Sequence, residues 1–138
     1  MKHLGRTQLF RAKIYGTEVW VEGFYVHDQT NDVHWIYTGR YIEPDHFQDR
    51  GYLEKVKIDP ETLGQFIGLN DINGKRIFEG DILANPVRRL GTGLGSLHII
   101  HDIRYASTMP LFASMWEVVG NDIDNPEMLK EASSCPTK

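Results

Sequence analysis

The chain has 138 residues, of which 25% are charged and 41% hydrophobic, and it contains a single cysteine, Cys135. One cysteine cannot form a disulfide within the chain, which excludes a disulfide scaffold and a cysteine-rich zinc module and favours a reducing cytoplasm. The net charge of −4 argues against a dedicated nucleic-acid binder, and no apolar run is long enough for a signal segment or a membrane span, so we expect no membrane association.

The first part of the chain reads as short β-strands. Residues 9–15, 19–26 and 33–41 alternate apolar and polar side chains, which is typical of half-buried strands. Gly16-Thr17 and the polar segment 28–32 supply turn residues between them, so the pattern predicts a three-stranded antiparallel meander. Residues 43–51 have no period and form a predicted loop, after which residues 52–58 resume a period of two.

A helical turn is predicted next, because Asp59 can cap it, Pro60 suits its first position and Gly64 ends it. A second group of strands then begins at Gln65. Asn73-Gly74 predicts a type I′ turn between Phe66-Ile67 and Ile77-Phe78. Residues 82–84, 97–105 and 112–119 are further strand candidates, and Asn125-Pro126-Glu127 begins a short C-terminal helix.

Many short strands about ten residues apart predict a mainly β protein built from compact barrels or rolls. We expect an N-terminal β lobe over residues 1–62, a C-terminal β domain over residues 63–132, and a disordered tail over residues 133–138.

An aromatic line is the first candidate surface. Trp35, Tyr37 and Tyr41 fall on one face of the third strand, where they could stack on nucleic-acid bases while Arg11, Lys13 or Arg40 contacts phosphates. The buried face of a small β lobe needs the same residue types, and this core interpretation is favoured. We therefore name Trp35, Tyr37, Arg40 and Tyr41 as a candidate interaction surface.

Two groups of acidic residues are candidates for catalysis or metal binding. Glu79 and Asp81 flank Gly80 and would share a face of a strand as paired carboxylates, although turn chemistry explains them more simply. The loop from Glu43 to Asp49 also carries Asp45 and His46, which could hold a metal if the chain folded over it, but a solvated loop is favoured.

The remaining motifs favour structural interpretations. His98 and His101 are three apart in a strand pattern and point to opposite faces, so a shared metal is not expected, and His101 is predicted to lie in the core. Gly91 to Gly95 lacks the spacing of a phosphate loop, and Asn70 to Gly74 fits a hairpin turn better than a calcium loop.

The chain resembles the YopX-like family of phage and prophage proteins over about residues 8–130. The resemblance is carried by the segments 10–13 (Phe-Arg-Ala-Lys), 20–24 (Trp-Val-Glu-Gly-Phe), 59–69 (Asp-Pro-Glu-Thr-Leu-Gly-Gln-Phe-Ile-Gly-Leu), 71–82 (Asp-Ile-Asn-Gly-Lys-Arg-Ile-Phe-Glu-Gly-Asp-Ile), 117–121 (Glu-Val-Val-Gly-Asn) and 125–129 (Asn-Pro-Glu-Met-Leu).

The resemblance implies that the C-terminal domain is an SH3-like barrel or roll, that the protein comes from a temperate phage and that it self-associates. It assigns no activity to any residue. The residues of its motifs are expected to be structural: Asn73, Gly74, Glu79, Gly80, Asp81, Gly120, Asn121, Asn125 and Pro126.

The functional hypothesis is a phage-encoded accessory protein of unknown biochemical function that works as a non-enzymatic binding or assembly module in the cytoplasm of a bacterial host cell. We expect a homo-oligomer, with a host or phage protein as a further partner, and neither a cofactor nor a metal. Nucleic-acid binding through the aromatic line and a metal-dependent hydrolase are the alternatives.

Overall fold

The computed structural model describes residues 8–47, 49–85, 97–102 and 115–129. The chain divides into two compact units, residues 1–64 and 65–138. The described residues are mainly β, with every assigned strand pair antiparallel, as predicted. The predicted domain boundary, between residues 62 and 63, lies two residues before this division.

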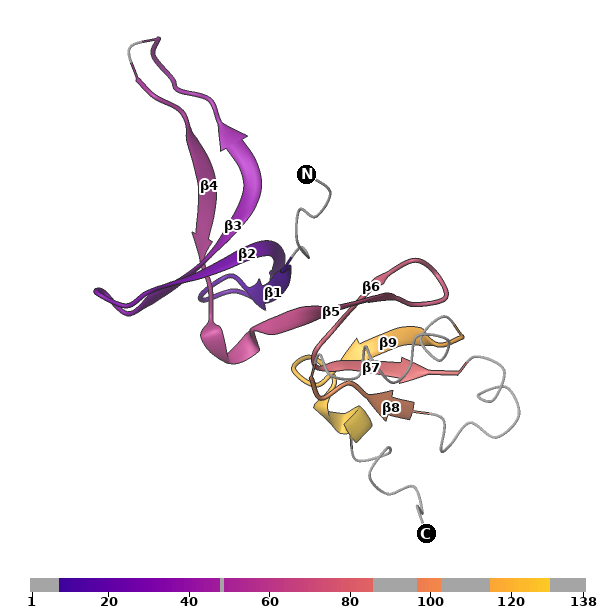
Figure 1. Ribbon diagram of the computed structural model, residues 1–138. Coiled ribbons are helices and arrows are strands. Elements are labelled where there is room, and N and C mark those ends of the chain that lie inside the picture. The colour runs from indigo at the N-terminus through magenta and orange to yellow at the C-terminus, as the bar shows by residue number, and fades with distance from the viewer. Residues whose placement is uncertain (1–7, 48, 86–96, 103–114, 130–138) are drawn as a thin grey trace. The chain divides into compact units, whose positions relative to one another are not determined.

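The first unit contains an antiparallel meander. Its strands are β1 (Phe10–Lys13), β2 (Trp20–Asp28), β3 (Val33–Ile42) and β4 (Tyr52–Lys57), in the spatial order β4-β3-β2-β1. Figure 1 shows β3 and β4 as one long hairpin. The predicted three-stranded meander is confirmed, and β4 extends it on the side of β3.

The sheet of the first unit curls, because the chain after β4 returns to the end of β1. Ile14 and Ile58 form an isolated antiparallel bridge, flanked by the hydrogen bond that the Tyr15 N–H donates to the Lys57 carbonyl over 2.9 Å. The buried side chains of Ala12, Ile36 and Ile58 form the core of this unit. Burying one isoleucine side chain stabilises a fold by about 1.5–3 kcal/mol, and Ile36 and Ile58 are both fully buried.

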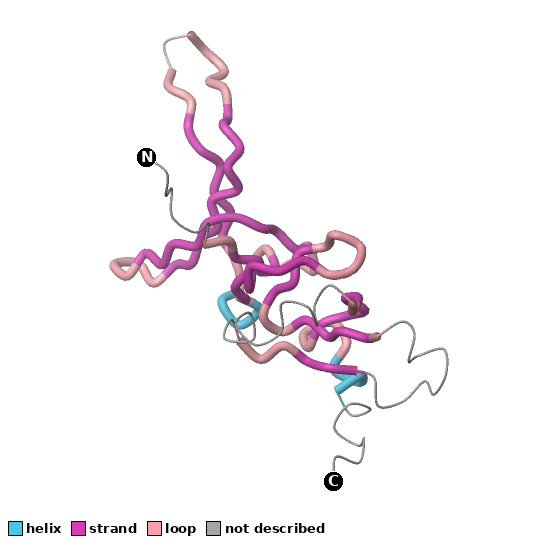
Figure 2. Tube along the Cα trace, turned by 45° about the vertical axis from the view of Figure 1, so that its right-hand side comes forward, coloured by secondary structure: helices cyan, strands magenta, loops and turns pink. Residues whose placement is uncertain are grey.

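Two irregular features interrupt the meander. The β3–β4 register shifts between Tyr37 and Tyr41, where Gly39 has a φ of +89° that glycine adopts readily. Residues 43–47 and 49–51 belong to the loop that ends the long hairpin, and they are drawn in pink in Figure 2. After β4, the predicted helical turn is a 3-10 turn, η1 (Pro60–Thr62), and the Asp59 carboxylate accepts a 3.0 Å hydrogen bond from the Glu61 N–H.

The second unit begins at the second residue of β5 (Gly64–Asn70), which forms the predicted hairpin with β6 (Arg76–Phe78), and Phe66 pairs with Phe78. The predicted type I′ turn is wrong. Such a turn needs two residues with positive φ, whereas Gly74 has one and Asn73 does not. The turn instead has five residues between the strands, and the Asp71 carboxylate holds it by accepting 2.8 Å hydrogen bonds from the N–H groups of Asn73 and Lys75.

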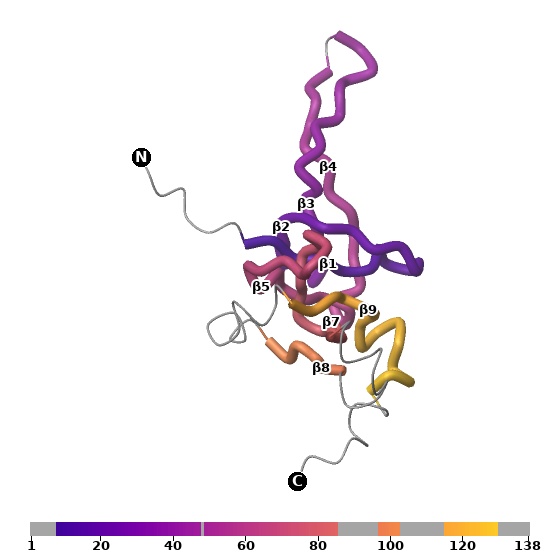
Figure 3. Tube along the Cα trace, turned by 90° about the vertical axis from the view of Figure 1, so that its right-hand side faces the viewer, coloured from indigo at the N-terminus to yellow at the C-terminus, as the bar shows by residue number. Residues whose placement is uncertain are grey.

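A three-stranded antiparallel sheet follows, with β7 (Asp81–Ala84) between β8 (Leu97–Ile99) and β9 (Glu117–Asn121) (Figure 3). Its core cluster consists of Ile67, Ile77, Leu83 and Ile100. The prediction that His101 lies in the core is wrong, because the strand ends at Ile99 and the next residue, Ile100, is buried while His101 is exposed. The backbone of Ile100 bonds to Gly80 and Asp81, which turns its side chain inward.

The expected SH3-like barrel is not confirmed. Within the described ranges the second unit has a hairpin and a separate three-stranded sheet, and no closed barrel is formed. Residues 103–105 of the predicted strand 97–105 and residues 112–114 of the predicted strand 112–119 lie outside the described residues, as do the Gly91–Gly95 run, Cys135 and the tail 133–138. Residues 126–129 are helical, so the predicted C-terminal helix begins at Pro126. None of the described helices is long and apolar enough to cross a membrane.

A candidate binding face on the first unit

One face of the first unit's sheet carries aromatic side chains beside lysines. In an antiparallel pair, residues directly opposite each other point to the same face. Phe24 lies opposite Tyr37 and Val26 opposite Trp35, while Lys57 and Lys55 of β4 lie opposite Trp35 and Tyr37. We call this set the aromatic–lysine face: Phe24, Val26, Trp35, Tyr37, Lys55 and Lys57.

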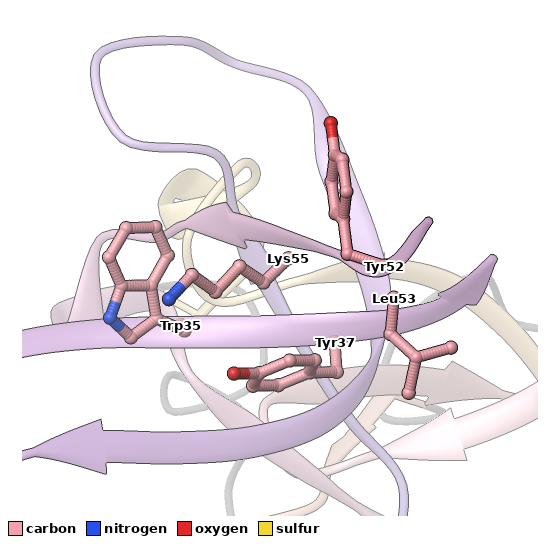
Figure 4. Close-up of a pocket in the computed structure, with 5 residues that line it drawn as sticks. All are labelled: Trp35, Tyr37, Tyr52, Leu53 and Lys55. Atoms are coloured by element: carbon pink, nitrogen blue, oxygen red, sulfur yellow. The ribbon is translucent and has the colours of Figure 1, made fainter. Parts of the chain in front are cut away.

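A groove of about 490 Å³ opens on this face (Figure 4). It is lined by Trp35, Tyr37, Tyr52, Leu53 and Lys55. The Lys55 side chain reaches toward Trp35, and its Nζ lies 4.3 Å from the centre of the indole ring. Such a cation over an aromatic ring is stabilised by about 0.5–1 kcal/mol at an exposed site. The groove therefore combines aromatic and apolar side chains with the positive charge of Lys55.

Several apolar side chains around the groove are open to solvent. Phe24 is 51% exposed and Leu53 is 55% exposed, and Val26 is exposed as well. Phe24 and Val26 lie two residues apart on this face and Leu53 lines the groove, so exposed apolar side chains accompany the groove on one side of the sheet.

The lysines of β4 are the exposed cations of this face. Lys55 and Lys57 are both exposed, and the Lys57 Nζ lies 4.2 Å above the ring centre of Tyr15. Arg11 and Lys13 of β1 also lie over an aromatic ring, that of Trp20, but both are buried. A ligand on the sheet face would therefore meet the β4 lysines rather than the β1 cations named in the sequence analysis.

The four residues of the predicted interaction surface do not all come together. Trp35 and Tyr37 line the groove, and Tyr41 lies farther along β3, opposite Leu53. Arg40 is outside the groove lining, with its Nη1 3.8 Å from an oxygen of Glu54. The favoured core interpretation of the aromatic line is wrong, because Ile36, on the opposite face of β3, is the core residue.

Sequence reasoning missed Leu53, Lys55 and Lys57. A signal was present, since residues 55 and 57 flank the apolar Val56 and must share the face opposite to it. Finding them also required the register that places β4 beside β3, which is a pairing between distant segments.

The two acidic groups proposed for catalysis or metal binding have other surroundings. An oxygen of Glu79 accepts a 2.9 Å hydrogen bond from the Gln65 N–H, and an oxygen of the buried Asp81 accepts one of 2.8 Å from the Phe78 N–H. Both carboxylates thus accept hydrogen bonds from backbone N–H groups. The structure describes all four candidate ligands of the 43–51 loop, Glu43, Asp45, His46 and Asp49. No three of them place ligand atoms close enough together to hold one metal ion.

The other motif residues lie at turns of the second unit or at the end of β9. Gly74 and Gly80 have φ values of +84° and +92°, and a Cβ on Gly120 would come within 2.6 Å of the Asn125 side-chain oxygen. That oxygen accepts a 3.1 Å hydrogen bond from the Asn121 N–H, just before the helical residues that begin at Pro126. These contacts are between backbone and short polar side chains, as turns require.

Comparison with known proteins assigns the chain to a family. A family model described as YopX protein matches residues 9–130, which is most of the chain. The chain belongs to the YopX family. The description names no activity, substrate or partner. Comparisons with curated proteins and with solved structures gave no match.

Proposed function

We propose that this YopX family member is a phage-encoded binding module and that its aromatic–lysine face binds single-stranded nucleic acid. The observation that carries the proposal is the exposed groove in which Lys55 lies over Trp35 beside Tyr37. Proteins that bind single strands combine aromatic rings, on which bases stack, with cations that follow the phosphates. The face supplies both on one sheet surface.

The net charge of −4 limits how tightly such a ligand would bind. A negatively charged protein repels a polyanion at long range, so the attraction must come from the short-range contacts of the face. If Lys55 and Lys57 neutralise two phosphates, the logarithm of the binding constant should fall with the logarithm of salt concentration with a slope of about −1.4. We therefore expect modest affinity that is highest at low salt.

Fluorescence anisotropy with labelled oligo-dT and oligo-U at low salt tests the proposal. We expect binding by the full chain, weakened about 5- to 150-fold by Trp35→Ala, because stacking on one base contributes about 1–3 kcal/mol. Lys55→Ala should lower the affinity and flatten the salt dependence.

Lys75→Ala is the matched control. Lys75 is an exposed lysine in the β5–β6 turn of the second unit and does not line the groove, so this variant makes the same change of charge without removing a groove residue. Circular dichroism establishes that each variant is folded. Absence of any anisotropy change at low salt, or equal losses for Lys55→Ala and Lys75→Ala, would rule the proposal out.

Self-association is a second candidate function, favoured by the exposed apolar side chains Phe24, Val26 and Leu53. A second copy of the chain could cover these side chains and build an assembly.

A further inference from the structure

The hairpin of β2 and β3 brings two histidines and an aspartate together at its end. His27 and His34 are directly opposite each other in the antiparallel register, so their side chains leave the same face of the sheet. Their imidazole rings are stacked, with centres 4.0 Å apart and planes within 5° of parallel. This cluster lies on the face of β2 and β3 opposite to the aromatic–lysine face, because its residues alternate with Val26 and Trp35.

The turn between the strands supplies the third member. Asp32 has a φ of +53°, a left-handed conformation that aspartate adopts more readily than most residues. Its Oδ1 lies 2.9 Å from the Nε2 of His27 and 3.8 Å from the Nε2 of His34. Asp28 fixes the shape of this turn, since its carboxylate accepts hydrogen bonds from the N–H groups of Thr30 and Asn31.

We infer that His27, Asp32 and His34 bind a divalent first-row transition metal ion such as Zn²⁺ through the two Nε2 atoms and a carboxylate oxygen. One ligand atom from each residue lies within 4.8 Å of the others. A tetrahedral zinc ion with bonds of about 2.0–2.1 Å separates its ligand atoms by about 3.3 Å. The two observed separations, 2.9 Å and 3.8 Å, lie on either side of that value.

A second contact prepares His34 for this role. The Tyr25 hydroxyl lies 2.7 Å from the Nδ1 of His34, the ring nitrogen other than the one that faces Asp32. In metal sites the non-coordinating ring nitrogen donates its N–H to an oxygen, which fixes the tautomer and leaves the other nitrogen free to bind. Tyr25 is thus a positioning residue, and its ring is stacked on that of His34 with planes within 6° of parallel.

The chemistry of the donors selects the class of metal. Two imidazole nitrogens and one carboxylate oxygen suit zinc and its neighbours better than calcium or magnesium, which prefer oxygen ligands only. Binding requires the stacked rings to tilt so that both Nε2 atoms point at one ion. The His27 side chain is 34% exposed and has room to turn. Three protein ligands leave a fourth position for water or for a partner's side chain.

Isothermal titration of the full chain with Zn²⁺ tests the inference. We expect one ion per chain, with binding abolished by His27→Gln or His34→Gln and weakened by Asp32→Asn. Tyr25→Phe should weaken binding about 10-fold, because loss of an outer partner costs about 10–100-fold in metal affinity. His46→Gln is the matched control, since His46 is an exposed histidine on the 43–51 loop.

Nitrogen NMR of the histidine rings gives a readout that a structural role alone would not move. Zinc should shift the Nε2 resonances of His27 and His34 and leave their Nδ1 atoms protonated. Failure of the wild-type chain to bind saturably, or binding that survives His27→Gln, would overturn the inference. Either result leaves the nucleic-acid proposal untouched, because that proposal concerns the opposite face.

Discussion

The environment of the half-buried His98 links its protonation to folding. Burial of its imidazole and, secondly, the nearby charge of His101 lower the pKa of His98 from the ordinary value of 6.5. The unfolded chain then binds a proton more readily than the folded chain. The folded protein therefore keeps the full stability that neutral His98 contributes at pH values above the pKa that His98 has in the unfolded chain. That stability is lost as pH falls through the lower pKa that His98 has in the folded chain.

We predict that the thermal unfolding midpoint falls as pH is lowered from about 7.5 to about 5, and that His98→Gln reduces this dependence. Trp116, whose ring lies 6.2 Å from that of His98, supplies a fluorescence signal beside the titrating group. His46→Gln, on an exposed loop, should leave the dependence unchanged. The same pH dependence in wild type and His98→Gln would contradict the prediction.

At the scale of elements, Asp71 connects the β5–β6 turn to β9. Besides the two turn N–H groups, its carboxylate accepts a 2.9 Å hydrogen bond from the Val118 N–H, 47 residues away in sequence. Asp71 is buried, so these donors lose their partner if the carboxylate is removed. We predict that Asp71→Ala lowers the free energy of unfolding by about 1–3 kcal/mol.

Chemical denaturation with urea measures this effect. Asp45→Ala, on the exposed 43–51 loop, removes the same group and should change stability by less than about 0.5 kcal/mol. Equal stabilities of the Asp71 and Asp45 variants would show that the connection contributes little.

The local elements of this fold were predictable, but the contacts between distant elements were not. Period-two alternation and turn residues located the β1–β2–β3 meander, η1 and the β5–β6 hairpin, because each depends on residues close in sequence. The turn type at Asn73 was missed because Asp71 determines it. The pairing of β7 with β9 joins segments more than thirty residues apart, and no local pattern encodes that register.

The candidate site shows the same division. The alternation in β3 placed Trp35 and Tyr37 on one face of the strand and Ile36 on the other. It could not tell which of the two faces packs against the core. The contributions of Lys55 and of the histidine pair depend on cross-strand register. The spacing of His27 and His34 around a predicted turn was the available signal for that cluster.

At the scale of the whole molecule, we predict concentration-dependent self-association through the exposed apolar side chains of the first unit. Light scattering of the wild-type chain should give a mass that rises over micromolar concentrations, and Phe24→Ser and Leu53→Ser should reduce that rise because they remove apolar area from the contact. Ile72→Ser is the matched control, since Ile72 is 51% exposed but lies in the second unit. A strict monomer at every concentration would refute self-association.

The position of β4 at the border of its sheet has a practical consequence. Among the strands of the first unit it pairs only with β3. On its other side the Lys57 carbonyl accepts the hydrogen bond of the Tyr15 N–H, and none of the described strands pairs with the rest of that side. Charged side chains, above all lysine, usually keep such an edge strand from pairing with the strands of other chains. We expect the charges of Lys55 and Lys57 to oppose such pairing, so a double lysine replacement can also lower the measured affinity by aggregating the protein. Turbidity and thioflavin readings belong beside every affinity measured on such variants.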